Sequence, residues 1–187
     1  MITDGGEHVS SSSLFFTKTI MKENISDILK EEAVSLGLCS QWTEEWLDNE
    51  TQQSLIDKYK RGFDFCLERD WPSVDYIKNH FDRNVLKENL IYNDEFIKID
   101  NGSNGVWILN GGCFGEITFR GYAAATVYVR HETKMRIVSM DDAIVNVRVL
   151  DNAEANLVSE GSSKMNAIVY GESASVNTAD NIKIRHK

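Results

Sequence analysis

Two acidic pairs, Asp141–Asp142 and Asp151–Asn152, are the residues of this sequence best suited to hold a metal ion. They lie ten residues apart, and their carboxylate and amide oxygens are ligands that calcium accepts. Asp and Asn are also common in tight turns, where their side chains bond the local backbone. We favour the turn interpretation, and we predict no metal site.

Other residue types that support catalysis occur without a recognisable pattern. The glycines of residues 102–112 do not lead into a helix as a phosphate-binding loop does. No Ser, Thr or Cys has an activating group beside it. The histidines have no ligand spacing, and we expect His131 to lie in an exposed turn; they are His8, His80, His131 and His186. We therefore predict no catalytic residue and no cofactor.

The three cysteines, Cys39, Cys66 and Cys113, are widely spaced and form no Cys-x-x-Cys motif. Neither a disulfide framework nor a zinc site is expected from such spacing. We interpret them as buried, reduced thiols of a cytoplasmic protein.

A ten-residue period runs from Gly115 to about Ser173. One of its columns is apolar and comprises Ile117, Val127, Ile137, Val147, Leu157 and Ala167. A second column has turn-forming residues, namely Gly121, His131, Asp141, Asp151, Gly161 and Gly171. Because ten is even, the alternation of a β-strand keeps its parity from one repeat to the next.

The charges test this parity. Of the fourteen Asp, Glu, Lys and Arg residues between positions 115 and 175, twelve are even-numbered. The two exceptions, Asp141 and Asp151, belong to the turn column. We therefore expect the odd positions to form one buried face and the even positions to face solvent.

Two architectures are compatible with the period. An antiparallel meander with two-residue turns would reverse the parity at each turn, unless its loops had odd lengths. In a β-solenoid, equivalent positions stack and each column keeps one chemistry. We favour the β-solenoid, with about twenty residues in each coil because ten residues are too few to enclose a core. The register loosens near Ala174, and Ile182 and Ile184 indicate a last strand.

The N-terminal half has the apolar spacing of helices. We expect helices from about Ser26 to Leu36, around Trp42 and Trp46, from Thr51 to beyond Cys66, after Ser73 and after Asp82. The fold class is thus α+β, with a flexible tail at residues 1–21, an acidic helical domain at 22–89 and a β-solenoid domain at 90–187. We interpret the aromatic side chains of the helices as packing residues; they are Trp42, Trp46, Tyr59, Phe63, Trp71 and Phe81.

The net charge of −9 lies entirely in the N-terminal half, because residues 1–100 carry 11 basic and 20 acidic side chains. Direct nucleic-acid binding through a basic surface is therefore not expected. No apolar run approaches the length of a membrane span, and we expect no membrane partner. Residues 1–20 do not have the pattern of a signal peptide. A basic partner of the helical half fits this charge distribution, but we favour the interpretation that the acidic surface is solvated and serves solubility.

A set of apolar residues occupies even positions, where the parity places the outward face. Such residues usually mark a contact surface. The contact is made with the protein's own helices, with a second copy or with another protein. The members of this predicted contact set are Tyr128, Val138, Met140, Leu150, Val158, Ile168 and Tyr170.

The alternation of Ala and Val, interrupted by Asp-Asn and Gly, is seen in the stretch from Val145 to Ala153. In this respect residues 115–185 resemble the single-stranded β-helices of adhesin-head-like domains. The helical half, through Gly62–Cys66, Trp71–Pro72 and Ile77–Phe81, looks like uncharacterised mobile-element and phage proteins of gut bacteria. The resemblance implies a β-helix and no activity.

Taken together, these patterns favour a non-enzymatic protein-binding or structural module that binds another protein or itself. The resemblance of the helical half favours a mobile-element or phage protein with a host protein as its partner. The alternative is a carbohydrate-active or carbohydrate-binding solenoid. An enzyme of that kind needs acidic and aromatic residues clustered on one outer face.

Overall fold

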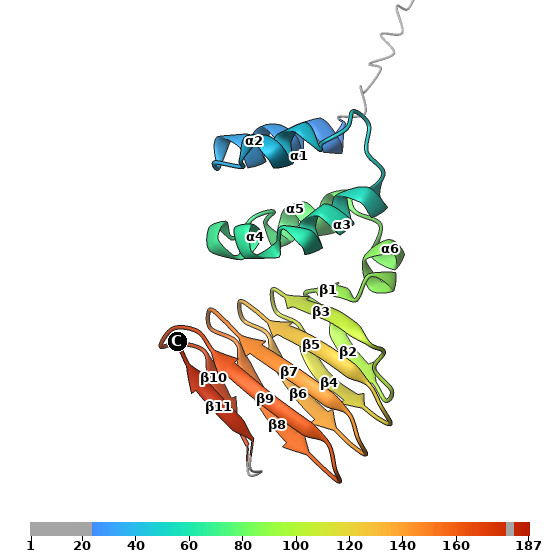
Figure 1. Ribbon diagram of the computed structural model, residues 1–187, viewed down its shortest axis with the longest axis vertical. Helices are drawn as coiled ribbons and strands as arrows, with labels where there is room; N and C mark the ends of the chain where they lie inside the picture. The colour runs from blue at the N-terminus through green and yellow to red at the C-terminus, as the bar shows by residue number, and fades with distance from the viewer. Residues whose placement is uncertain (1–23, 179–181) are drawn as a thin grey trace, which may run out of the picture.

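The structure, a computed structural model, describes residues 24–178 and 182–187. The expected N-terminal tail and His8 lie outside these residues. The six helices of this described part form two layers that stack on one end of a β-solenoid, with α1 and α2 farthest from the strands (Figure 1). The helices are α1 (Ile25–Ser35), α2 (Ser40–Glu44), α3 (Gln52–Arg61), α4 (Phe63–Arg69), α5 (Val74–His80) and α6 (Arg83–Glu88). No helix in the described part of the chain is long and apolar enough to cross a bilayer.

The helix starts agree with the caps expected from the sequence. The side chains of Thr51, Ser73 and Asp82 accept hydrogen bonds from backbone amides in the first turns of α3, α5 and α6. Such bonds satisfy donors that the helix itself leaves unpaired. The single helix expected from Thr51 to beyond Cys66 was wrong, because the chain breaks at Gly62. A Cβ atom there would lie 3.3 Å from the carbonyl oxygen of Lys58, so glycine suits the tight junction between α3 and α4.

The strands form two parallel sheets, which confirms the solenoid and excludes the meander. Sheet A has the order β1-β3-β5-β7-β9-β11, and sheet B has the order β10-β8-β6-β4-β2. Each coil contributes one strand to each sheet. The strands are β1 (Ile91–Asn93), β2 (Phe96–Ile99), β3 (Gly105–Asn110), β4 (Phe114–Phe119), β5 (Ala124–Val129), β6 (Lys134–Ser139), β7 (Ile144–Val149), β8 (Glu154–Ser159), β9 (Lys164–Val169), β10 (Ser175–Asn177) and β11 (Lys183–His186).

The register between coils confirms the twenty-residue repeat. Val127 of β5 is paired with Val147 of β7, and Ile137 of β6 is paired with Leu157 of β8. Near the C-terminal end, Val176 of β10 is paired with Ala155, so the parity slips by one residue there, as the sequence indicated. The last strand indicated by Ile184 is β11, where this residue is paired with Ala167.

The turn column is explained by backbone geometry. Its residues adopt left-handed conformations with φ between 56° and 79°, as does Gly111 before them. Glycine takes this conformation without strain, and Asp and His are the residues that tolerate it better than most others. Asp141 and Asp151 therefore occupy the turn column for conformational reasons.

Between Ile97 and Val169 the core of the solenoid consists of odd-numbered side chains, which confirms the parity argument. Val147 is 1% exposed, and Ile117, Val127, Ile137 and Leu157 are fully buried. At the helical end, stacked rings of Tyr92 and Trp107 enlarge the core. At the other end, Val176, Ile182 and Ile184 cover it and stay partly exposed. The core therefore runs through the whole solenoid.

A second apolar cluster joins the helices to the solenoid. Phe63 and Cys66 of α4 and Ile56 of α3 pack with Ile108 and Tyr128, which point outward from sheet A. The rings of Phe63 and Tyr128 meet edge to face, with centroids 4.6 Å apart. The helices thus cover the outer face of the first strands of sheet A.

Candidate functional site

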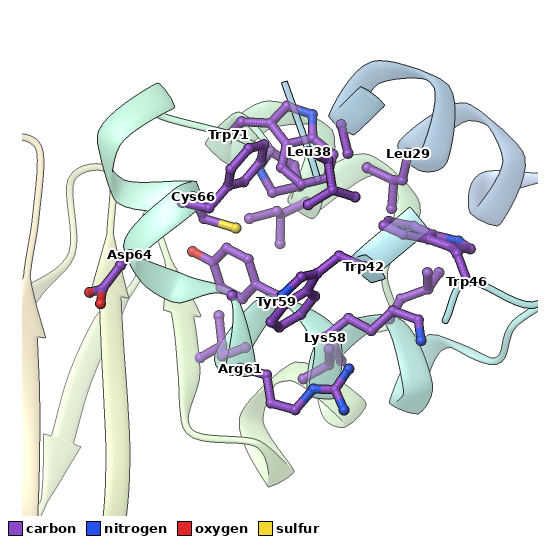
Figure 2. Close-up of a pocket in the computed structure, with 18 of the residues that line it drawn as sticks. Leu29, Leu38, Trp42, Trp46, Lys58, Tyr59, Arg61, Asp64, Cys66 and Trp71 are labelled. Atoms are coloured by element: carbon purple, nitrogen blue, oxygen red, sulfur yellow. The ribbon is translucent and has the colours of Figure 1, made fainter. Parts of the chain in front are cut away.

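An apolar pocket of about 370 Å³ lies between the two helical layers. Figure 2 shows side chains on both of its sides: Trp71, Leu38 and Leu29 on one, and Tyr59, Trp42 and Arg61 on the other. Leu29 and Ala33 of α1 form one wall, and Leu55 and Ile56 of α3 form another. The pocket is large enough for a small ligand or for one or two large side chains of a partner.

Two cations stand at the rim of the pocket, and each is held by its neighbours. The guanidinium of Arg61 lies 4.8 Å from the ring centroid of Trp42 and 2.8 Å from the carboxylate of Glu45. The ammonium of Lys58 lies 3.0 Å from the carboxylate of Glu50. Because these charges are paired, the rim contributes fixed aromatic and aliphatic surface more than free charge.

The two ionisable groups deepest in the pocket are held in their neutral forms. Burial raises the pKa of the Cys66 thiol to about 12, and burial also raises the pKa of the Tyr59 hydroxyl. At neutral pH both groups keep their protons, so neither is an activated nucleophile or a base.

The sequence interpretation of the aromatic residues missed this pocket. All of them except Phe63 line it, namely Trp42, Trp46, Tyr59, Trp71 and Phe81. Trp46 is buried and Trp42 is only partly exposed, so these rings also pack as expected. Helical spacing puts aromatic residues on one face, but it does not tell whether the facing layer fills the space between them.

Three residues of the predicted contact set meet beside α4. Tyr128, Leu150 and Tyr170 line a groove of about 280 Å³ together with Asp64, Leu67 and Glu68 of α4. In Figure 2 Asp64 points away from the apolar pocket, toward the strands. Tyr128 and Leu150 pack with the helical cluster, so part of this set contacts the protein's own helices.

The other members of the contact set lie elsewhere. Val138 and Val158 belong to sheet B and are paired with each other, whereas Ile168 belongs to sheet A. Met140 follows β6, and its sulfur contacts the guanidinium of Arg120. The set does not form one patch, because columns ten residues apart alternate between the two sheets. Val138 is only 4% exposed, so the chain itself covers this member of the set.

A polar junction links α4 to the corner of the solenoid. Arg130 is 3% exposed, and its Nη2 lies 2.9 Å from Oδ1 of Asp70. His131 Nε2 lies 2.8 Å from the same oxygen, and His131 Nδ1 accepts a hydrogen bond from the amide of Gly111. His131 lies in a turn, as the sequence indicated, and its side chain is 20% exposed beside Asp70.

The acidic pairs confirm the turn interpretation. Oδ2 of Asp141 accepts a hydrogen bond from the amide of Gly121, and Oδ2 of Asp151 accepts one from the amide of His131. Each side chain thus ties its own turn to the preceding coil. The two turns lie at opposite edges of the sheets, so the pairs do not share an ion. Within residues 24–178 and 182–187, no three His, Cys, Asp or Glu side chains group as metal ligands would.

The outward carboxylates of sheet B bear on the alternative of a carbohydrate-active enzyme. Glu116 lies between Lys98 and Arg136, and Glu154 is 2.8 Å from Lys134. The hydrogen bond from Lys98, with that from Arg136, holds the pKa of Glu116 below its ordinary value. The general acid of a glycosidase has a raised pKa, so Glu116 does not have the shift expected of that one group.

The cysteines differ in exposure. Cys66 and Cys113 are buried free thiols, as expected, but Cys39 is exposed at the start of α2, so the expectation of burial was wrong for this residue.

Comparisons with protein families, with curated proteins and with solved structures found no match to this chain.

Proposed function

We propose that the protein is a non-enzymatic binding module that accepts apolar side chains of a protein partner into the pocket between its helical layers. The pocket itself is the observation that carries this proposal. It is lined mainly by aromatic and aliphatic groups, and Trp42 and Trp71 flank it with partly exposed rings. Such rings are the residues that most often anchor a protein interface.

The attachment of the outer layer supports entry of a partner. Helices α1 and α2 are held through a small cluster of four buried side chains, Leu29, Ala33, Trp46 and Leu55. The solenoid core contains many more buried side chains than this cluster. Elements with few buried contacts are the ones that open locally at the lowest free energy. The outer layer is thus suited to move aside when a partner segment enters.

The charge distribution favours a basic partner segment. Residues 1–100 have a net charge of −9. Asp64 and Glu68 are exposed on α4, and Glu32 of α1 accepts a hydrogen bond from the indole of Trp71 at the pocket. A segment that combines an apolar anchor with Lys or Arg residues is complementary to this surface. We propose a host protein of a mobile element as the source of this segment.

Selection from a displayed library of random peptides tests this proposal. Peptides enriched by the wild-type protein are expected to carry Leu, Phe or Trp beside Lys or Arg. Trp42→Ala should weaken their binding by about tenfold or more, since truncation of an anchoring residue has that effect. Fluorescence anisotropy with labelled peptides measures the change.

Tyr122→Ala is the matched control, because Tyr122 is an 86% exposed aromatic residue far from the pocket lining. This variant should bind the selected peptides as the wild type does. The proposal fails if no peptide is enriched, or if folded Trp42→Ala binds the selected peptides as well as the control does.

A further inference from the structure

The charges of the two sheets differ in a way that the total charge conceals. The six strands of sheet A contain four Lys or Arg residues and no Asp or Glu, whereas the strands of sheet B contain both signs. The cations of sheet B are Lys98, Lys134 and Arg136, and each forms an ion pair with Glu116 or Glu154. The cations of sheet A are Arg148, Lys164, Lys183 and Arg185.

The cations of sheet A have no carboxylate partner among the described residues. Arg148 instead lies over the ring of Tyr128, at 5.2 Å from its centroid. Lys183 and Arg185 are exposed. In an acidic protein, such a run of unpaired cations forms a local positive field that attracts an anion.

The register places polar side chains between these cations. Thr126, Asn146 and Asn166 are paired across β5, β7 and β9, and Asn166 is paired with Lys183 of β11. In the neighbouring row, Arg148 is paired with Ile168, and Ile168 is paired with Arg185. These two rows line a groove of about 330 Å³ on the outer face of the sheet.

We propose that this groove binds an acidic oligosaccharide, one whose sugar units carry carboxylate or sulfate groups. Arg and Lys bind such groups through charge-assisted hydrogen bonds. The amides of Asn146 and Asn166 and the hydroxyl of Thr126 can donate to and accept from sugar hydroxyls. Ile168 supplies an apolar surface for the C–H face of a sugar ring. This binding is separate from the proposed protein-binding function and uses a different face of the molecule.

The groove is less suited to other polyanions. Single-stranded nucleic acids need aromatic platforms on which bases stack. The tyrosines nearest to this groove, Tyr128 and Tyr170, line the neighbouring groove beside α4 instead. An acidic peptide could bind the cations. It would not supply the hydroxyl groups that the row of amide and hydroxyl side chains can bind. The side chains therefore fit a ligand rich in both negative charge and hydroxyl groups.

Isothermal titration calorimetry with the full chain at low ionic strength tests this proposal. The probes are oligogalacturonate and a heparin-derived oligosaccharide, with cellohexaose as the neutral sugar, poly-glutamate as the acidic peptide and oligo-dT as the nucleic acid. We expect at least one of the two acidic oligosaccharides to bind more tightly than cellohexaose, poly-glutamate and oligo-dT. The double variant Lys183→Gln/Arg185→Gln should weaken this binding by about tenfold or more, as expected for the loss of charge-assisted hydrogen bonds.

Two further variants separate the groove from the net charge. Lys98→Gln/Arg136→Gln removes the same number of charges from sheet B and should change the affinity by less than about twofold. Asn146→Asp/Asn166→Asp keeps the side-chain size but adds negative charge to the groove, and should abolish binding. The proposal is overturned if neither acidic oligosaccharide binds, if poly-glutamate or oligo-dT binds as tightly, or if the two double-glutamine variants lose affinity equally.

Discussion

Arg130 and Asp70 lie sixty residues apart in the chain and join the helices to the solenoid through one ion pair of 2.9 Å. The side chain of Arg130 is almost completely buried, whereas that of Asp70 is exposed. Asp70 follows α4 in a left-handed conformation that aims its carboxylate at the corner of the solenoid. Burial alone would raise the pKa of Asp70, but the hydrogen bonds and charges of His131 and Arg130 hold this pKa below its ordinary value.

Asp70→Asn should destabilise the protein, because a buried guanidinium would lose its nearest carboxylate. We expect a loss of about 1–3 kcal/mol in the free energy of unfolding, less than for a fully buried pair since the Asp70 side chain is exposed. Urea denaturation measures it. Asp100→Asn is the control, because Asp100 is exposed and lies 3.7 Å from Lys98, whose side chain is also exposed. Equal stability of the two variants would contradict the role of this ion pair.

The stability should fall in acid, and Glu95 should be one cause. Burial alone would raise the pKa of Glu95, but hydrogen bonds from Lys87 and Arg83 hold it below its ordinary value. A carboxylate with a lowered pKa in the folded state stabilises the protein fully above its unfolded pKa, and this stabilisation is lost as the pH falls through the folded pKa. The urea midpoint should therefore decrease from about pH 5 to about pH 3.

Glu95→Gln should have a lower urea midpoint at neutral pH and a smaller decrease in acid, because one of the titrating groups is gone. Denaturation curves at several pH values compare the two proteins. A pH dependence identical to that of the wild type would show that this carboxylate contributes nothing to it.

Val147→Asp should place an unpaired charge in the middle of the solenoid core. The expected loss is about 4 kcal/mol or more, which is typical of a buried charge without a partner. Thermal denaturation followed by circular dichroism measures it. Asn146→Asp is the control, since Asn146 is exposed on the opposite side of the same strand. Similar melting temperatures for both variants are incompatible with the solenoid core.

The fragment of residues 90–187 should aggregate when it is expressed alone. Removal of the helices exposes Ile91, Ile108 and Tyr128, which the helical cluster covers in the whole protein, and also the edge strand β1. The same fragment with Ile108→Ser and Tyr128→Ser should be more soluble. Gel filtration distinguishes the two, and a monomeric unmodified fragment would mean that the helices are not needed to protect the solenoid.

Only Cys39 should react with a thiol reagent in the folded protein. Burial raises the pKa of Cys66 to about 12 and that of Cys113 to about 11, and both side chains are shielded from solvent. Titration with dithionitrobenzoate should therefore detect one thiol in the native state and three in denaturant. Fast reaction of a second native thiol would mean that a buried site opens readily.

The solenoid was predictable because its signal is repeated. Each ten-residue unit indicates the same parity. The assignment of a residue such as Val147 to the core is therefore supported by the equivalent residues before and after it. Arg130 shows the limit of this argument: its even position indicates solvent, but α4 packs over that corner. The position of α4 depends on contacts of high sequence separation, which have no period.

The pocket and the two grooves could not be predicted from the sequence for a related reason. The aromatic spacing of Trp42 and Trp46 indicates one face of a helix, but the width of the space opposite that face depends on how α1 lies over α3. The grooves on sheet A depend on which columns share a sheet. The ten-residue period alone does not tell which columns lie in the same sheet. The assignment follows only from the fact that two periods make up one coil, so that columns twenty residues apart share a sheet.

The uniform register of the coils also relates the number of coils to the distance between the helices and the C-terminal strand. Coils from β3 to β9 repeat with the same pairing and the same left-handed turns, so a whole coil can be added or removed without altering either end. Each such change would move the C-terminal strand by about 4.8 Å relative to the helices, the spacing of neighbouring strands. Chains that differ by multiples of twenty residues in the solenoid would therefore hold the helices and the C-terminal strand at different, discrete separations.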